Sequence, residues 1–155
     1  MSTVGLVVVI SAWLGQADQP PPLTMIVCPV TATRESREQK YFEQGLEPYK
    51  SVLQSLPYDT FRKAAGSKSA RAGFSVETSV KISERYTLFV TPVGIDEDKR
   101  VNLKVRVEET RIVNDEIVHR DALTVNTCIA KDNHLRLGGL ESDAGDLWLL
   151  ISFKD

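Results

Sequence analysis

The feature that most constrains the fold is a strict alternation of apolar and polar residues in the second half of the chain. In RVNLKVRVEE, residues 100–109, the apolar residues Val101, Leu103, Val105 and Val107 are separated by polar or charged ones. Successive side chains of a β-strand point to opposite faces, so this segment would bury one face and expose the other. The pattern predicts a strand of an antiparallel sheet with one face in water.

Other segments with the same period of two lie on both sides of this one. The predicted strands are 23–33, 74–82, 85–91, 100–109, 121–130 and two runs within 135–153. Turns are expected at VGIDEDKR, at Asn114–Glu116 and at KDNH. Because strands are not alternating with helices, a parallel βαβ fold is not expected. The sequence predicts a mainly β chain, an antiparallel β-sandwich or barrel-like domain.

One amphipathic helix is expected near residues 46–56. Four apolar residues of LEPYKSVLQSL fall on one side of such a helix: Leu46, Tyr49, Leu53 and Leu56. Pro48 suits the first helical turn, and Pro57 ends the segment. The apolar stripe predicts packing against a sheet rather than a cofactor site.

The first seventeen residues have features of a cleaved export signal. VGLVVVISAWL, residues 4–14, has the length of a signal-peptide core and is too short for a stable membrane span, which takes ~20 residues. Gly15 and Ala17 are the small residues expected before a cleavage site. We therefore expect a signal peptide at 1–17 and a single β-rich domain at 18–155. Since no Lys or Arg precedes the apolar run, the alternatives to this interpretation are a true start that lies upstream, a buried first strand and a retained anchor.

Cys28 and Cys128 are the two cysteines of the chain. In an exported protein an even number of cysteines is compatible with a disulfide, which would contribute about 4–5 kcal/mol for a loop of ~100 residues. Each cysteine also lies in an apolar, strand-like segment, so two separate buried thiols are the alternative. Their wide separation argues against a metal site or a CxxC redox centre.

The charge balance gives no reason to expect nucleic acid as a partner. Lys and Arg number 19 and Asp and Glu 21, for a net charge of −2. Proteins that bind nucleic acid usually carry a basic stripe, whereas the basic residues here are scattered. The densest group, which includes Arg62 and Lys68, lies in a stretch rich in Ala, Gly and Ser that we interpret as a solvated connection.

The sequence contains no recognisable catalytic set. The two histidines, His119 and His134, have no metal-ligand spacing, and GxSxG, P-loop and GxGxxG motifs are absent from the sequence. We therefore predict a protein that is not an enzyme, that uses no cofactor, and that has no catalytic, cofactor-binding or metal-binding residues.

Acidic residues gather where turns are expected. Asp96 and Asp98 form one such group, and Glu141, Asp143 and Asp146 form another. Either group has enough carboxylates to contribute to a Ca²⁺ site. However, Lys99-Arg100 interrupts an EF-hand pattern, and charged turns between strands are the simpler interpretation.

The C-terminal stretch LRLGGLESDAGDLWLLISF, residues 135–153, predicts a hairpin that closes a sheet. Its glycines and acidic residues lie between two apolar runs, which suits a turn better than a ligand-binding loop. In the second run, Trp148 and Leu150 alternate with the main apolar face and would point away from the core. We expect them to pack under the helix. The alternatives are that Trp148 and Leu150 form a possible partner surface or that they stack on a ligand.

The order of these features resembles that of small exported β-sandwich proteins of bacteria such as planctomycetes and myxobacteria, whose function is not established. The likeness is carried by the export-like start, by LEPYKSVLQSLPYDTF at 46–61 and by LRLGGLESDAGDLWLLIS at 135–152. It implies a secreted or periplasmic sandwich domain and supplies no catalytic residue.

We expect a non-enzymatic exported domain that binds another protein, as a component of a cell-envelope or secreted assembly. Sheet edges and the Trp148 face would provide the contacts. The alternative is a sandwich that binds a lipid, a sugar or calcium, and a hydrolase with a carboxylate pair is the third option. A closed apolar cavity would favour ligand binding, whereas exposed apolar patches or a long free strand edge would favour protein binding.

Overall fold

The computed structural model describes residues 19–154, so the predicted signal peptide at 1–17 lies outside the described residues. The strands are β1 (Leu23–Thr33), β2 (Tyr41–Phe42), β3 (Thr60–Lys63), β4 (Lys68–Ala72), β5 (Thr78–Lys81), β6 (Tyr86–Ile95), β7 (Arg100–Val113), β8 (Glu116–Ala130), β9 (Leu135–Ser142) and β10 (Gly145–Lys154). Between β2 and β3 lie a 3₁₀ helix, η1 (Glu47–Tyr49), and the short α-helix α2 (Lys50–Leu53).

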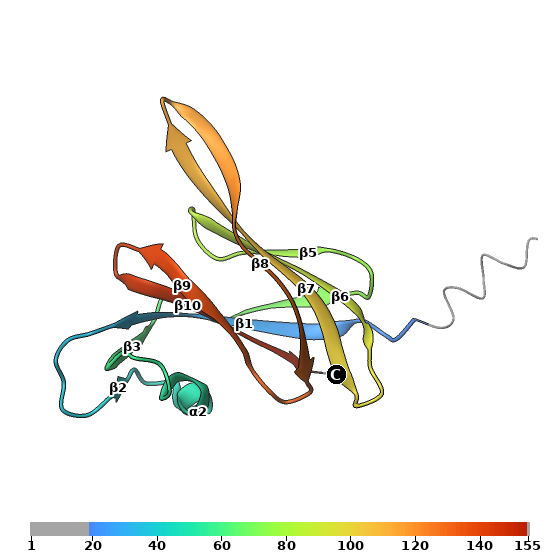
Figure 1. Ribbon diagram of the computed structural model, residues 1–155, viewed down its shortest axis with the longest axis horizontal. Helices are drawn as coiled ribbons and strands as arrows, with labels where there is room; N and C mark the ends of the chain where they lie inside the picture. Colours follow the sequence, from blue (N-terminus) through green and yellow to red (C-terminus); the bar gives the residue numbers. More distant parts are fainter. Residues whose placement is uncertain (1–18, 155) are drawn as a thin grey trace, which may run out of the picture.

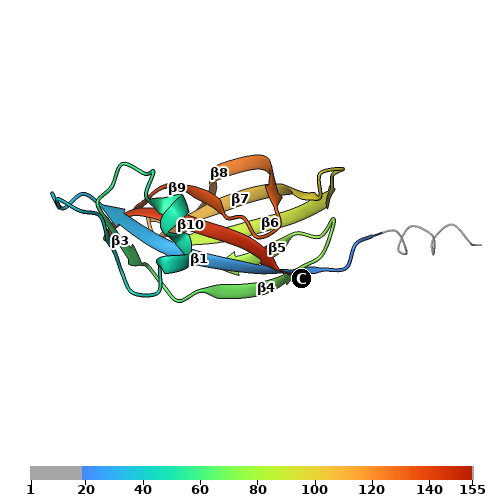
Figure 2. The ribbon, with the colours of Figure 1, turned by 90° about the horizontal axis from the view of Figure 1, so that it is seen from below.

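The strands pair into two sheets that face each other (Figures 1 and 2). Sheet A has the order β2-β3-β1-β10-β9, with β4 also paired to β1, and sheet B has the order β5-β6-β7-β8. Every strand pair is antiparallel except the short β2–β3 pair. The predicted antiparallel β-sandwich is confirmed, because the strands form two separate sheets.

The main core lies between the two sheets and follows the predicted alternation. Its buried residues on β7 are Val101, Leu103, Val105 and Val107, and those on β10 are Leu147, Leu149, Ile151 and Phe153. The residues between them on β7 are exposed or half-buried. Period-two alternation therefore identified the inward face of sheet B correctly.

A second apolar cluster covers the outer face of sheet A. Its buried members are Cys28, Val30, Ala32, Leu46, Leu53, Leu56, Phe61 and Leu150. The predicted apolar stripe is thus a packing face, but the helix is shorter than the predicted 46–56. After Leu53 the chain tightens into a turn in which the Leu56 amide donates to the Leu53 carbonyl (3.0 Å), and Pro57 has no amide to continue it.

β1 is the central strand of sheet A, although it contains Pro29 and a proline within a strand usually indicates an edge strand or a bulge. It pairs with β10 on one side and with β4 and β3 on the other. On that second side β4 reaches Val27 and β3 begins at Val30, so Pro29 lies in the gap between them. Its missing amide therefore interrupts no strand ladder.

The basic stretch around Arg62 and Lys68 forms β3 and β4 and is not the solvated connection that its composition suggests. Both strands pair along β1, and Ala72 at the end of β4 is buried in the main core. These residues form strands because their backbone pairs with the apolar strand β1. Local composition does not reveal this long-range pairing.

The C-terminal stretch forms the predicted closing hairpin of β9 and β10. The register shifts between Leu147 and Trp148, and Gly139 is the extra residue of this bulge, with φ of 80°. A side chain at the neighbouring Gly138 would collide with the ring of Trp148, which packs directly against this glycine.

Candidate functional site

The β7–β8 hairpin extends beyond the sandwich as a two-stranded ribbon, the orange projection at the top of Figure 1. β6 pairs with β7 only as far as Tyr86–Glu109, whereas β7 and β8 remain paired up to Val113–Glu116. In residues 111–118 the two strands therefore pair only with each other. We call this segment the arm.

A two-residue turn closes the arm. Val113 pairs with Glu116, and Asn114 and Asp115 between them have φ of 51° and 65°. Positive φ at both central positions defines a type I′ turn, whose twist matches that of an antiparallel ribbon. Asn and Asp enter this region more readily than other side-chain-bearing residues. The turn predicted at Asn114–Glu116 is confirmed.

The arm exposes β-branched apolar residues on both of its faces. Ile112 and Ile117 pair across the two strands and are 76% and 69% exposed. Val113 and Val118 alternate with them, so they lie on the other face, and both are exposed as well. Side chains of this kind are usually buried, and a contiguous exposed group marks a binding surface.

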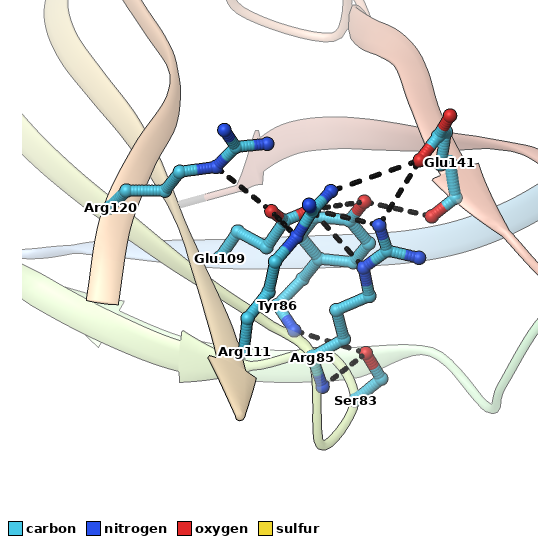
Figure 3. Close-up of polar contacts among 7 residues, drawn as sticks. All are labelled: Ser83, Arg85, Tyr86, Glu109, Arg111, Arg120 and Glu141. Atoms are coloured by element: carbon cyan, nitrogen blue, oxygen red, sulfur yellow. Dashed lines mark hydrogen bonds and ion pairs between the residues drawn. The ribbon is translucent and has the colours of Figure 1, made fainter. Parts of the chain in front are cut away.

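The base of the arm is held by a buried carboxylate (Figure 3). Glu109, the last β7 residue paired with β6, is 2% exposed. Its oxygens are 3.1 Å from Nη2 of Arg85 and 3.0 Å from Nε of Arg120, and Arg111 also pairs with it. Three arginines from the β5–β6 turn, β7 and β8 thus converge on one carboxylate.

The same network reaches sheet A through β9. The Tyr86 hydroxyl lies 3.1 Å from the Glu109 carboxylate and 2.8 Å from the Glu141 carbonyl oxygen. The Glu141 carboxylate pairs with Arg85 at 3.2 Å. Ser83 shapes the turn that carries Arg85, since its Oγ accepts hydrogen bonds from the amides of Arg85 and Tyr86 at 3.2 Å each. The arm is therefore tied to both layers of the sandwich.

The Glu109 network is suited to hold the base of the arm in place and not to transfer protons. Burial raises the pKa of the Glu109 carboxyl, but hydrogen bonds from Arg111, Tyr86 and Arg120 outweigh burial and hold the pKa at about 2. Burial also raises the pKa of the Tyr86 hydroxyl, which stays protonated at neutral pH. Because Glu109 is ionised and already accepts several hydrogen bonds, it is unsuited to act as an acid or a base.

Two clefts border this network. A cleft of about 600 Å³ lies between the β5–β6 turn and the C-terminal hairpin, with Ile82 and Leu147 among its apolar residues and Arg62 among its charged ones. A smaller one of about 320 Å³ is lined by residues that include Arg111 and Arg120. Both are open to solvent and differ from the closed apolar cavity that would favour a small-ligand carrier.

Trp148 and Leu150 do not form the possible partner surface that their alternation suggests. Leu150 is fully buried in the second cluster, and Trp148 is half-buried against the same cluster. Tyr58 lies edge-on to Trp148, with ring centroids 6.3 Å apart. The two side chains do point away from the main core, but the segment between β2 and β3 covers them.

Cys28 and Cys128 are not joined, so the possible disulfide is absent from this structure, in which both are free cysteines. Cys28 is buried in the second cluster on the outer face of sheet A, whereas Cys128 is exposed on β8 of sheet B. They lie on opposite sides of the sandwich. The alternative of separate buried thiols holds for Cys28 alone.

The acidic residues at the turns accept hydrogen bonds that stabilise the turns and form ion pairs with arginine. Asp96 Oδ1 accepts hydrogen bonds from the amides of Asp98 (3.0 Å) and Arg100 (2.9 Å), and the Arg100 guanidinium pairs with both carboxylates. Asp146 accepts a hydrogen bond from the Tyr58 hydroxyl at 2.6 Å. Within residues 19–154, no three His, Cys, Asp or Glu side chains are grouped as metal ligands would be.

The two histidines lie in unrelated places. His119 Nδ1 is 3.0 Å from the Thr110 hydroxyl and 3.3 Å from the Glu108 carboxylate. Both contacts use one ring nitrogen, whereas a catalytic triad uses the two nitrogens for different partners. His134 contacts the Tyr49 ring edge-on, and burial lowers its pKa. Neither histidine forms a site with the other.

Comparison of the chain with protein-family models, with curated proteins and with solved structures found no match. In the part of the chain that the structure describes, no helix is long and apolar enough to cross a membrane. The arm is therefore the candidate functional site on its own geometry. Sequence reasoning identified its turn but missed its exposure, because the point at which β6 stops pairing with β7 is not visible in the sequence of the hairpin.

Proposed function

We propose that the protein is a non-enzymatic domain that binds another protein through the tip of the arm. The observation that carries this proposal is the exposed, cross-strand pair of Ile112 and Ile117 on a ribbon that projects from the sandwich. The partner surface that fits this tip is an apolar groove, which would cover both faces of the ribbon.

Burial of the tip is a sufficient source of affinity. Moving an isoleucine or valine side chain from water into an apolar site contributes about 1.5–3 kcal/mol. Four such side chains are grouped at the tip: Ile112, Val113, Ile117 and Val118. A small cluster of apolar anchors commonly supplies most of the energy of a protein interface.

The charged base of the arm adds to this affinity by limiting motion. A two-stranded ribbon by itself is only marginally stable in water. Here the Glu109 network fixes both strands of the ribbon where they leave the sandwich, and the Thr110 amide donates to the Arg85 carbonyl at 2.7 Å. A ribbon that is already ordered loses less conformational entropy on binding.

The test compares two matched pairs of substitutions. Ile112→Thr with Ile117→Thr removes apolar surface from the tip while keeping β-branched residues that suit a strand. Val93→Thr with Ile95→Thr makes the same change at exposed positions of β6 (49% and 46% exposed), outside the arm. Partners are captured from the native host by the tagged protein and quantified by mass spectrometry, and affinity is then measured with the purified partner.

We expect the arm pair to weaken binding to that partner about 100-fold, since two isoleucine contacts of at least 1.5 kcal/mol each are lost. The β6 pair should leave the dissociation constant within about twofold. Equal losses for both pairs, or no loss for the arm pair, would refute the proposal. Circular dichroism of each variant checks that the fold is kept.

We also propose that the protein works outside the cytoplasm, as a component of a cell-envelope or secreted assembly. This proposal is supported by the apolar run at 4–14 and the small residues Gly15 and Ala17. Mass spectrometry of protein recovered from the exported fraction should find Asp18 at the amino terminus. Recovery of exported protein with Met1 intact would contradict cleavage.

A further inference from the structure

The second half of the strand at the outer edge of sheet B lacks the usual protection against pairing. β8 ends the strand order of sheet B and lies at the margin of the molecule in Figure 2. From Leu123 to Ala130, beyond a bulge at Ala122, it contains no charged residue, no glycine and no proline. Such an edge offers unpaired backbone amides and carbonyls to another strand, and natural proteins usually block it.

The other edges of the two sheets are blocked by ordinary means. β5 has four residues, and β2 has two. β9 has the bulge at Gly139 and carries Arg136 and Glu141, and β4 carries Lys68 and Arg71. β8 has a bulge as well, at Ala122, but its stretch from Leu123 to Ala130 is longer than β5 or β2 and carries no charge. This stretch is therefore the edge that is open to pairing.

We propose that β8 pairs antiparallel with β8 of a second copy of this chain, about a two-fold axis at Asn126. The pairing would join two copies of sheet B into one continuous sheet. This surface is separate from the arm tip, so the inference goes beyond the proposed function and does not depend on it.

The sequence of the edge is complementary to itself in this register. On the inner face of the sheet, Leu123 would lie opposite Ile129 of the second copy and Val125 opposite Thr127. On the outer face, Thr124 would lie opposite Cys128, and Asn126 opposite its own copy. Leu123, Val125 and Thr127 are half-buried and Ile129 is buried, while Thr124, Asn126 and Cys128 are exposed, so each pair joins residues of one face.

The bulge in β8 limits where this register can apply. Leu123 pairs with Val107 and Asp121 with Glu108, so Ala122 is the extra residue of a bulge and the regular edge runs from Leu123 to Ala130. A shift of two residues is the smallest that keeps the faces matched. In either shifted register Leu123 would lose its apolar partner Ile129, because it would lie opposite Thr127 or Lys131.

The register is tested by cysteine cross-linking in solution. Directly opposed residues of antiparallel strands have Cα atoms about 4.5–5.5 Å apart, within the range of a disulfide. Asn126→Cys with Cys128→Ser places one thiol on the axis and should give a disulfide-linked dimer under mild oxidation. Thr124→Cys with Cys128→Ser is the matched control, since the introduced thiols of the two copies would lie about 13 Å apart along the strands and should not cross-link. The remaining thiol, Cys28, is buried in both variants.

Two further variants check the same geometry. Thr124→Cys with the native Cys128 should cross-link, because the two positions face each other across the axis. Asn126→Lys places two like charges opposite each other and should raise the dimer dissociation constant at least tenfold in sedimentation velocity, with an unchanged circular dichroism spectrum. Asn126 is exposed, so this change does not disturb the monomer.

Wild-type protein should sediment at twice the monomer mass in a concentration-dependent manner. A wild-type protein that stays monomeric at high concentration, or equal cross-linking of the thiols at 124 and 126, would overturn the proposal. The Ile112→Thr, Ile117→Thr variant should still form the dimer, so a failure of this proposal is distinguishable from a failure of partner binding by the arm.

Discussion

The Glu109 network predicts a large and pH-dependent contribution to stability. A pKa of about 2 in the folded protein, against 4.5 for an ordinary glutamate, corresponds to about 3 kcal/mol of stability at neutral pH. Because the folded-state pKa is depressed, this stability is present above pH ~4.5 and is lost as the pH falls toward 2. The physical source is the convergence of Arg85, Arg111 and Arg120 on one buried carboxylate.

The substitution that isolates this contribution is Glu109→Gln, which keeps the shape of the side chain and removes the charge. At pH 6 the variant should be about 3 kcal/mol less stable than the wild type, and more if the uncompensated arginines cannot reach water. With an m-value of about 1–3 kcal/mol per molar, the urea midpoint should fall by about 1–3 M. Unfolding is followed by circular dichroism at a single protein concentration.

The pH dependence of the stability difference between the wild type and the Glu109→Gln variant tests this assignment. In the wild type Glu109 becomes protonated near pH 2, and the gap between wild type and variant should shrink below about 1 kcal/mol. Other carboxyls titrate in both proteins and cancel from the difference. Glu84→Gln is the control, because this exposed residue forms only a surface pair with Lys81 and should cost less than about 0.5 kcal/mol. A gap that stays constant from pH 6 to pH 2.5 would refute the assignment.

Three smaller predictions concern packing and the thiols. Gly138→Ala should cost about 1–3 kcal/mol in urea unfolding because its methyl group would collide with a ring, whereas Gly66→Ala, with no atom within 4 Å of the added carbon, should change stability by less than about 0.5 kcal/mol. Leu53→Ala should cost about 2–5 kcal/mol, since Leu53 is fully buried in the second cluster, and a smaller loss would show that α2 packs loosely there. Ellman's reagent should modify Cys128 in the native protein and Cys28 only after unfolding, because burial shields Cys28 and raises its pKa. Modification of neither thiol before reduction would indicate the disulfide.

Much of the fold follows from local patterns in the sequence. Period-two alternation identifies the inward faces of β6 and β7, and Asn114-Asp115 identifies the turn between β7 and β8, because strand geometry and positive φ act on neighbouring residues. The apolar stripe at 46–56 likewise predicts a packing face. Its helical extent is shorter than predicted, because proline and tight turns restrict it to one α-helical turn.

Features that depend on which strands are neighbours could not be predicted from local sequence patterns. Nothing in the local sequence of β3 and β4 marks them as strands, since they form strands only by pairing with β1. The outward alternation of Trp148 and Leu150 is correct, but whether an outward face meets solvent or a covering segment depends on chain that lies far away in the sequence.

The order of apolar and polar residues is enough to predict a mainly antiparallel chain, the positions of its turns and the inward faces of its main strands. Which strand ends lack neighbours follows only from the arrangement of the two sheets, and this arrangement exposes the arm and the edge of β8. It also brought Arg85, Glu109, Arg120 and Glu141 together from four separate elements. The division has one physical cause: periodicity and turn geometry are properties of adjacent residues, whereas strand order and the convergence of charges are properties of residues far apart in the chain.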